Sequence, residues 1–394
     1  MEELEKNLLC IFNKKDRIGH MVYPMLGMRM KKIRVYILAI SLLLTLNACE
    51  KKENVYSMLS IQTLNQYVMQ EGIVYLNPVT HRAEYFEYKT QNYFPVCGKV
   101  NCKHDEKNKE CLANRLGRAD IIGKISDKWY YLSTDEYGKR TFYSCDLGGE
   151  NEKIVGEFNH CMAMKAVFYE TYCIVATNDI VISQKGEMNG DNYQSVSGIY
   201  RFNFETGKTD NICTPKSDGQ YEILGQYEKF LVYQEENEGK FHLKKLNLEN
   251  GEITDLLEKE CVYYGCVGKN EVICNIQKND KYNVVRVSLK TGEYETVMEE
   301  NQCAAQIFVN GEEKLITVLN NPEEYETYQC SENNNYQLIR KGTLKTYLRP
   351  IDIKNEIVVG QIMGADSEKQ KYDLATISLE DYLAGKTNWK ILEY

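Results

Sequence analysis

From about residue 57 to the C-terminus, short apolar or alternating runs follow one another with polar turns between them. The clearest unit is Tyr221 to Leu257, YEILGQYEKFLVYQEENEGKFHLKKLNLENGEITDLL, whose four runs are separated by turns at 227–229, 235–240 and 249–251. This pattern predicts a four-stranded antiparallel meander. One meander cannot bury its own faces, so the unit requires neighbours of the same kind.

The unit recurs along the chain, and its second strand is the easiest part to recognise. The seven second strands are GIVYL (Gly72 to Leu76), KWYYL (Lys128 to Leu132), YCIVA (Tyr172 to Ala176), FLVYQ (Phe230 to Gln234), EVICN (Glu271 to Asn275), KLITV (Lys314 to Val318) and EIVVG (Glu356 to Gly360). In the sixth unit, YQLIRK (Tyr336 to Lys341) is the predicted third strand. Turns at Gly207, Gly251 and Gly292 lie 44 and 41 residues apart, a period typical of propeller blades. We therefore predict an all-β fold, a β-propeller of seven four-stranded blades, with six or eight as alternatives.

The turns ETGK, ENGE and KTGE place glycine where a tight hairpin needs a positive φ. Around such turns, CDLGGENEKIV, LNLENGEITDLL and VSLKTGEYETVM share one cadence of strand, glycine turn and strand. In this cadence, residues 56–394 resemble bacterial β-propeller lipoproteins related to the TolB-like and DUF5050-type repeat families. The resemblance implies a propeller, but those families span binding, scaffolding and uncharacterised members, so it implies no ligand.

The N-terminal segment predicts export. Four basic residues (Arg29, Lys31, Lys32 and Arg34) precede the apolar run Val35 to Leu46. This run is too short for a comfortable membrane span and is typical of a secretion signal. LNAC, at Leu46 to Cys49, resembles a bacterial lipobox, which implies cleavage before Cys49 and a diacylglycerol on its thiol. The alternative is a short membrane anchor that ends by chance at a cysteine.

These assignments divide the chain into three parts. Residues 1–48 are an N-terminal extension and lipoprotein signal peptide, 49–56 are a tether, and 57–394 are the propeller. We expect translation to begin at Met28 or Met30, because lipoprotein signals start close to their basic residues. Two or more acyl chains anchor a protein stably, so the expected location is the extracytoplasmic side of the cell membrane, with lipid on Cys49.

Charge and cysteine content narrow the range of partners. Removing residues 1–48, with 8 basic and 4 acidic side chains, changes the formal charge from -9 to -13 (40 basic against 53 acidic). That balance argues against nucleic acid as a partner. The 14 cysteines are too few for a disulfide-built scaffold in a chain of 394 residues. We expect a monomer.

The long insertions are predicted to lie on one face of the ring. In a meander, connections between second and third strands emerge on the same face as connections between blades. We call it the long-connection face, and the opposite one the short-turn face. The insertions are Cys97 to Gly117, Asn178 to Ser197 and Asn320 to Asn335. Insertions gathered on one face of a repeat protein usually build its binding surface, although drift in loop length is the alternative.

One insertion contains a cluster of metal-ligating residue types. Cys97, Cys102, His104 and Cys111 lie within 15 residues of sequence. Three thiolates and an imidazole satisfy tetrahedral Zn²⁺, and a catalytic zinc is not expected because four protein ligands close the coordination shell. In an exported chain a disulfide, Cys102 to Cys111 or Cys97 to Cys111, is the competing hypothesis, and free thiols are a third.

No motif predicts catalysis. Asn189, Asp191 and Asn192 offer oxygens for Ca²⁺, yet such a composition is typical of a solvated loop. We expect no catalytic residues and no cofactor other than a structural zinc. The predicted function is a non-enzymatic binding module for an unknown protein, peptide or glycan. The alternative is a propeller hydrolase or lyase on extracellular glycans or peptides, which requires convergent carboxylates at the channel mouth.

Overall fold

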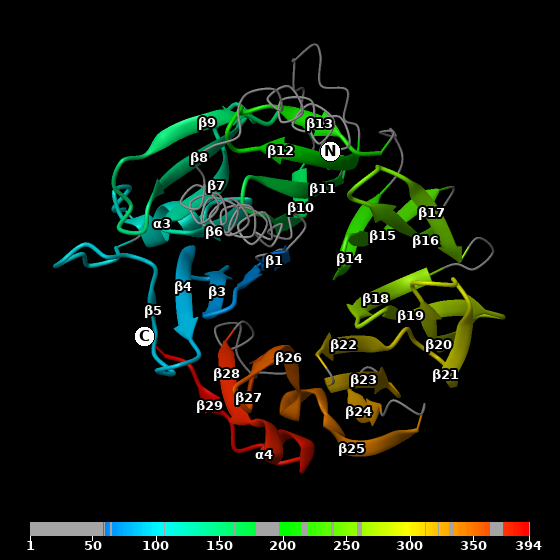
Figure 1. Ribbon diagram of the computed structural model, residues 1–394. Coiled ribbons are helices and arrows are strands. Elements are labelled where there is room, and N and C mark those ends of the chain that lie inside the picture. Colours follow the sequence, from blue (N-terminus) through cyan, green and yellow to red (C-terminus); the bar gives the residue numbers. More distant parts are fainter. Residues whose placement is uncertain are drawn as a thin grey trace, which may run out of the picture. The chain divides into compact units, whose positions relative to one another are not determined.

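The structure is a computed structural model that describes residues 58–393, except 59, 64, 106, 161, 179–196, 214–219, 238–239, 258–261, 312, 322, 331–334 and 363–372. Its strands form seven antiparallel four-stranded blades arranged in a ring (Figure 1). The first strand of each blade lies nearest the centre of the ring and the fourth lies at its rim. The predicted seven-bladed β-propeller is confirmed.

Each blade is one continuous stretch of chain. Blades one to three comprise β2 (Gln66–Val68), β3 (Gly72–Asn77), β4 (Arg82–Glu87) and β5 (Tyr93–Pro95); β6 (Ile121–Ile125), β7 (Lys128–Thr134), β8 (Arg140–Asp146) and β9 (Lys153–Glu157); and β10 (Met162–Phe168), β11 (Tyr172–Asn178), β12 (Gly198–Asn203) and β13 (Thr209–Asn211). Blades four and five comprise β14 (Tyr221–Tyr227), β15 (Phe230–Asn237), β16 (Lys240–Asn247) and β17 (Ile253–Leu257); and β18 (Val262–Gly268), β19 (Glu271–Lys278), β20 (Lys281–Ser288) and β21 (Tyr294–Asn301). Blades six and seven comprise β22 (Gln306–Asn310), β23 (Glu313–Leu319), β24 (Glu324–Cys330) and β25 (Tyr336–Thr343); and β26 (Leu348–Lys354), β27 (Ile357–Ile362), β28 (Leu374–Ser378) and β29 (Lys390–Ile391).

Short helices lie in three connections. They are α3 (Leu112–Gly117) between blades one and two, the 3₁₀ turn η1 (Leu344–Thr346) between blades six and seven, and α4 (Leu379–Leu383) between β28 and β29. Within the described residues, no helix is both long enough and apolar enough to span a bilayer.

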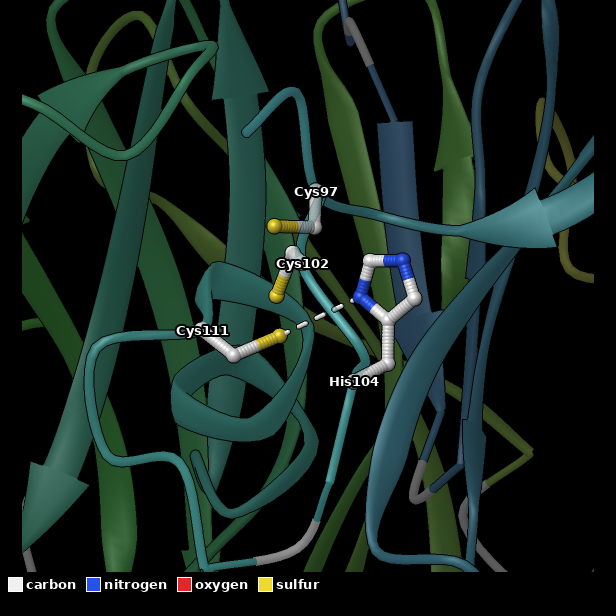
Figure 2. Close-up of side chains that lie close together, drawn as sticks. All are labelled: Cys97, Cys102, His104 and Cys111. Atoms are coloured by element: carbon white, nitrogen blue, oxygen red, sulfur yellow. Dashed lines mark hydrogen bonds between the residues drawn. The ribbon is translucent and has the colours of Figure 1, made fainter. Parts of the chain in front are cut away.

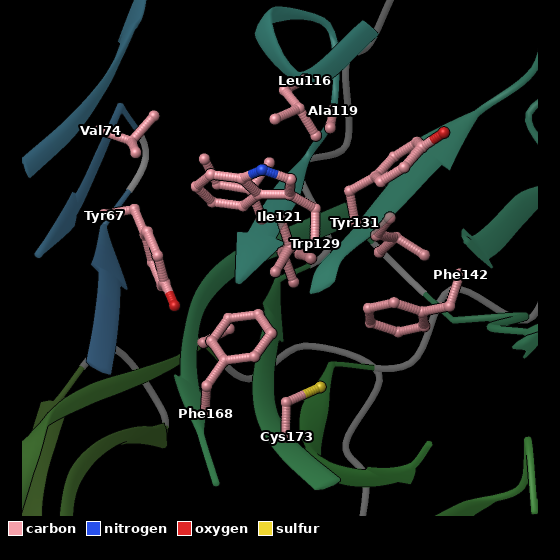
Figure 3. Packing of buried hydrophobic residues seen from close by; sticks show 14 of the residues in the cluster. Tyr67, Val74, Leu116, Ala119, Ile121, Trp129, Tyr131, Phe142, Phe168 and Cys173 are labelled. Atoms are coloured by element: carbon pink, nitrogen blue, oxygen red, sulfur yellow. The ribbon is translucent and has the colours of Figure 1, made fainter. Parts of the chain in front are cut away.

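The second strand of a blade is buried on both of its faces, which explains its continuous apolar character. Five consecutive residues of β3 and six of β11 are buried. Between blades one, two and three, aromatic side chains fill the interface, and Tyr67 packs edge-on against Phe168 at 5.7 Å between ring centroids (Figure 3). Trp129 lies in the same cluster and is 5% exposed. Packing between blades, and not within one, therefore provides the hydrophobic core.

The ring closes where blade one meets blade seven, which come from opposite ends of the propeller segment. No strand is exchanged between these two blades, because each blade is one continuous stretch of chain. Their contact is an apolar cluster that includes Tyr75 and Phe86 from blade one and Val359 from blade seven. Beside it, the Tyr88 hydroxyl donates to the Asp352 carboxylate, which also accepts from the Asn310 side chain of blade six. One buried carboxylate thus joins three blades.

One strand was not assigned from the sequence. The strand β1 (Ser60–Thr63) pairs antiparallel with β2 and also with β10, the innermost strands of blades one and three. It thereby joins these two blades into a nine-stranded sheet. The innermost strand of blade two, β6, contacts β1. The pairing also fixes the direction of the chain, because Ser60 lies opposite Phe168 at the end of β10 and Thr63 opposite Gln66 at the start of β2.

The sequence-based assignment of blade six was wrong in one strand. The third strand is β24, and Tyr336 to Lys341 lies in the fourth, β25. The supposed insertion Asn320 to Asn335 therefore contains a strand, and the connection between the second and third strands is short. The buried side chains of β24 are Tyr325, Thr327 and Cys330, and the polar residues between them hide its alternation.

Candidate functional site

Two adjoining cavities, of about 810 and 520 Å³, lie at one mouth of the central channel. They share Gln66, Glu222, Tyr264 and Arg349 as lining residues. Each of these residues comes from the innermost strand of a different blade, and β10 and β22 also contribute. We call the two together the channel-mouth cavity. Within the described residues, β6 is the one innermost strand that does not line it, and β1 contacts that strand.

The channel-mouth cavity opens on the long-connection face. Its lining residues lie near the starts of innermost strands, where connections from the preceding blade arrive. Two of the predicted insertions do connect strands on this face: 97–117 precedes β6, and 178–197 joins β11 to β12. Asn178 lines the cavity, and its side-chain oxygen accepts from the Tyr221 backbone N–H at 2.7 Å. The cavity therefore opens on the face to which the loop lengths assigned the insertions.

Four of the innermost strands share a local irregularity that sequence reasoning missed. The strands β10, β14, β18 and β26 each skip one residue in their pairing with the second strand of the blade. A β-bulge of this kind re-aims the neighbouring side chains. In β18 the extra residue is Tyr264, with φ of 43° and 63% exposure. Glycine after the bulge, at Gly225 and Gly265, was the signal that could have revealed it.

The described lining of the cavity is aromatic and weakly cationic. It holds two cationic side chains, Lys165 and Arg349, and one carboxylate, Glu222. Burial lowers the pKa of Lys165, while the nearby Glu222 acts in the opposite direction. Aromatic side chains from several blades complete the wall, among them Phe241 and Tyr264.

The structure brings together all four residues of the predicted metal cluster. The ligand atoms of Cys97, Cys102, His104 and Cys111 all lie within 4.8 Å of one another (Figure 2). The Nδ1 atom of His104 lies 3.4 Å from the Cys111 sulfur. Cys111 is fully buried and the other three are partly exposed. Each of the described cysteines is free.

Local backbone geometry explains how a short loop gathers these side chains. Asn101 and His104 adopt positive φ angles of 62° and 50°, a region that asparagine and histidine enter more readily than most residues. The Cys102 N–H donates to the Lys99 carbonyl at 3.3 Å, which closes a turn between the first two cysteines. Cys111 is the N-cap of α3, so the last ligand is attached to a packed helix.

The electrostatics of the cluster differ from one sulfur to the next. Burial raises the pKa of the Cys97 thiol, but hydrogen bonds from backbone N–H groups, Lys99 foremost, outweigh it and lower that pKa overall. Burial raises the pKa of Cys111 to about 11. Burial, and then the nearby charge of Arg82, lower the pKa of His104. A lowered pKa favours the neutral imidazole, the form that binds metals.

Two sequence candidates lie outside the described residues. They are the lipidation site Cys49 and the loop that carries Asn189, Asp191 and Asn192. Outside the cysteine and histidine cluster, His160 stacks on Tyr200 at 3.8 Å between ring centroids and serves as a packing residue.

The fold has similar solved structures. TolB from Acinetobacter baumannii is 12% identical with a TM-score of 0.41, over 69% of this chain and 63% of TolB. Puromycin hydrolase is 10% identical with a TM-score of 0.47, over 78% of this chain and 50% of the hydrolase. Oligogalacturonate lyase in complex with manganese is 12% identical with a TM-score of 0.42, over 65% of this chain and 72% of the lyase. No protein-family model and no curated protein matches the sequence. The likeness is one of fold alone.

Proposed function

We propose that this protein is a lipid-anchored, extracytoplasmic binding module that takes its ligand at the channel-mouth cavity. The observation that carries the proposal is the cavity itself, on the face where the sequence gathers its insertions. Pockets lined by apolar and aromatic side chains with a few converging polar groups are the usual form of a ligand site. The N-terminal signal and its lipobox-like end at Cys49 support the anchor.

The composition of the cavity favours binding over hydrolysis. Glycoside hydrolysis generally uses a pair of carboxyl groups, and other acid-base mechanisms also need titratable groups held together. Among the described lining residues Glu222 is the single carboxylate, and no histidine lines the cavity. An aromatic wall with Tyr264 and Phe241 instead suits stacking against a sugar ring or an aromatic side chain.

The charges indicate the ligand chemistry. Within the described residues the side chains of Lys165 and Arg349 make no hydrogen bond or salt bridge, although Glu222 acts on Lys165 through its charge and the molecule as a whole is acidic. A guanidinium binds carboxylates in a bidentate arrangement, and an ammonium acts as a point charge. We therefore propose a ligand with a carboxylate next to a ring, which an acidic glycan or an acidic peptide supplies.

Ligand binding is tested with arrays of uronic-acid glycans and acidic peptides, each paired with its neutral counterpart. We expect the acidic probes to bind, and Arg349→Gln or Lys165→Met to weaken binding by about ten- to a hundredfold, since a hydrogen bond to a charged group contributes about 1.5–3 kcal/mol. Lys269→Gln removes the same charge from an exposed turn on the short-turn face and should not change binding. Equal binding of acidic and neutral probes would contradict the proposal.

The anchor is tested separately in a bacterial host fed with labelled palmitate. The wild-type chain should become labelled and sediment with membranes, whereas Cys49→Ser should remain unlabelled and appear in the soluble fraction. A wild-type protein that carries no label would refute the lipid anchor and leave the binding site to be judged on its own assay.

A further inference from the structure

We infer that Cys97, Cys102, His104 and Cys111 bind a structural zinc ion that fixes the connection between blades one and two. The inference does not depend on the proposed binding function. It concerns the residues in Figure 2, which approach one another from both ends of a polar loop.

The geometry of the four ligand atoms fits zinc. Tetrahedral zinc has Zn–S distances of about 2.3 Å and Zn–N distances of about 2.0–2.1 Å, which places its ligand atoms roughly 3.3–3.8 Å apart. The longest separation in the cluster is within 4.8 Å, and the contact between His104 Nδ1 and the Cys111 sulfur is already 3.4 Å. A contraction of about 1 Å at most, by rotation of side chains, would complete the tetrahedron. Thiolate and imidazole are also the ligands that zinc prefers.

A disulfide explains this arrangement less well. One disulfide would use two of the three thiols and leave the third thiol beside the imidazole with no role. The structure instead directs three sulfurs and one ring nitrogen toward a common point. With four protein ligands the coordination shell is closed, so the ion has no position for a substrate and its role is structural.

In the described part of the segment between the ligands, no residue is buried. Residues 98–110 are polar apart from Val100, which is 88% exposed. The hydrogen bonds of the described loop are local, and they include Lys99 Nζ to the Glu110 carbonyl at 3.0 Å and Asn114 Nδ2 to the Asp105 carbonyl at 2.6 Å. A metal that joins its two ends would supply the order that burial does not.

The zinc would also hold α3 in place between two blades. Leu112 and Leu116 of α3 are fully buried in the cluster that joins blades one, two and three. At the end of the helix, Gly117 lies so close to blade one that a Cβ would fall 2.4 Å from the His81 carbonyl oxygen. Cys111 begins α3, so ordering the loop orders the start of this helix and one wall of the long-connection face.

The test begins with the metal content of the exported full-length protein. We expect about one zinc per chain by elemental analysis, and X-ray absorption with three sulfur ligands near 2.3 Å and one nitrogen near 2.0–2.1 Å. Cys102→Ser and His104→Ala should lower the zinc content at least tenfold. Cys303→Ser and His242→Asn, which remove the same residue types away from the cluster, should retain it. A wild-type protein without zinc, or one whose mass shows a disulfide among these cysteines, would overturn the inference.

A second measurement uses the wild-type protein alone, so it tests the inference even if the variants fail to fold. The wild-type protein is treated with a zinc chelator and then with trypsin, whose targets in the loop are Lys99, Lys103, Lys107 and Lys109. Loss of zinc should speed cleavage there by at least tenfold, and added zinc should restore protection. Release of the zinc with no change in cleavage rate would refute the structural role.

Discussion

The buried carboxylate of Asp352 is expected to stabilise the closure of the ring between blades one, six and seven. Its removal tests this expectation directly. Asp352 lies in β26, is 8% exposed, and accepts hydrogen bonds from Tyr88 of blade one and Asn310 of blade six. Its carboxylate also accepts from the Ile353 N–H at 2.9 Å. Asp352→Ala would leave the Tyr88 hydroxyl and the Ile353 N–H without this acceptor, whereas Asn310 keeps the Ile353 carbonyl at 2.7 Å.

The magnitude follows from these contacts. A buried polar group that loses its partner costs about 1–3 kcal/mol, so two such groups cost roughly 2–6 kcal/mol. Removal of a desolvated carboxylate offsets part of this cost, because burial raises the pKa of Asp352 despite its hydrogen bonds. We expect a net loss of about 2–4 kcal/mol. For about 340 folded residues the unfolding entropy is roughly 0.7 kcal/mol per degree, so the melting temperature should fall by about 3–6 °C.

The assay is urea unfolding followed by the fluorescence of the two tryptophans, Trp129 and Trp389. The control is Asp127→Ala, which changes an exposed aspartate in a turn and is expected within about 0.5 kcal/mol of wild type. The double variant Tyr88→Phe with Asp352→Ala lacks the Tyr88 hydroxyl that Asp352→Ala alone leaves without its acceptor. Its loss of unfolding free energy should therefore be smaller than the sum of the two single losses by about 1–3 kcal/mol. Strict additivity of the two losses would refute the view that Tyr88 and Asp352 act as a pair across the closure.

Three further outcomes are expected from the same structure. The pKa of Asp352 is higher in the folded than in the unfolded chain, so the folded state holds the proton more tightly. In unfolding titrations the wild type should therefore lose stability relative to Asp352→Asn as pH rises from about 3.8 through the folded pKa. Burial lowers the pKa of His160, so stability should decline as pH falls below about 6.5, and His160→Gln should flatten that decline. Gly123→Ala should cost about 1–3 kcal/mol by denaturant unfolding, because the new Cβ would lie 2.1 Å from the Phe168 ring, whereas Gly148→Ala meets no atom within 4 Å and should be nearly neutral.

Local patterns predicted the blades well where apolar residues alternate or run together. The unit at Tyr221 to Leu257 folds as β14 to β17, with polar turns near the predicted positions. Gly207, Gly251 and Gly292 have the positive φ angles of 65° to 76° that their hairpins need. Blade six failed because β24 buries Thr327 alongside Tyr325, and a buried threonine does not register as apolar.

The two candidate sites differ in how visible they are in the sequence. The cluster of Cys97, Cys102, His104 and Cys111 was predicted because these residues lie in one loop, so their proximity in sequence implied proximity in space. The channel-mouth cavity was not found residue by residue. Gln66 and Arg349 meet there although 283 residues separate them, and bulges such as the one at Tyr264 decide which side chains face inward.

The sequence by itself therefore determined the hairpins of the blades and the four members of the cysteine and histidine cluster, since hairpins and short loops depend on contacts within a few tens of residues. Tertiary structure alone decided the pairing of β1 with two blades, the closure through Asp352, and the cavity lined by six blades. These features depend on the number of blades in the ring and on shifts of register within their innermost strands. Neither the number of blades nor the register shifts can be predicted from a single repeat, because both are set only when all seven blades pack together.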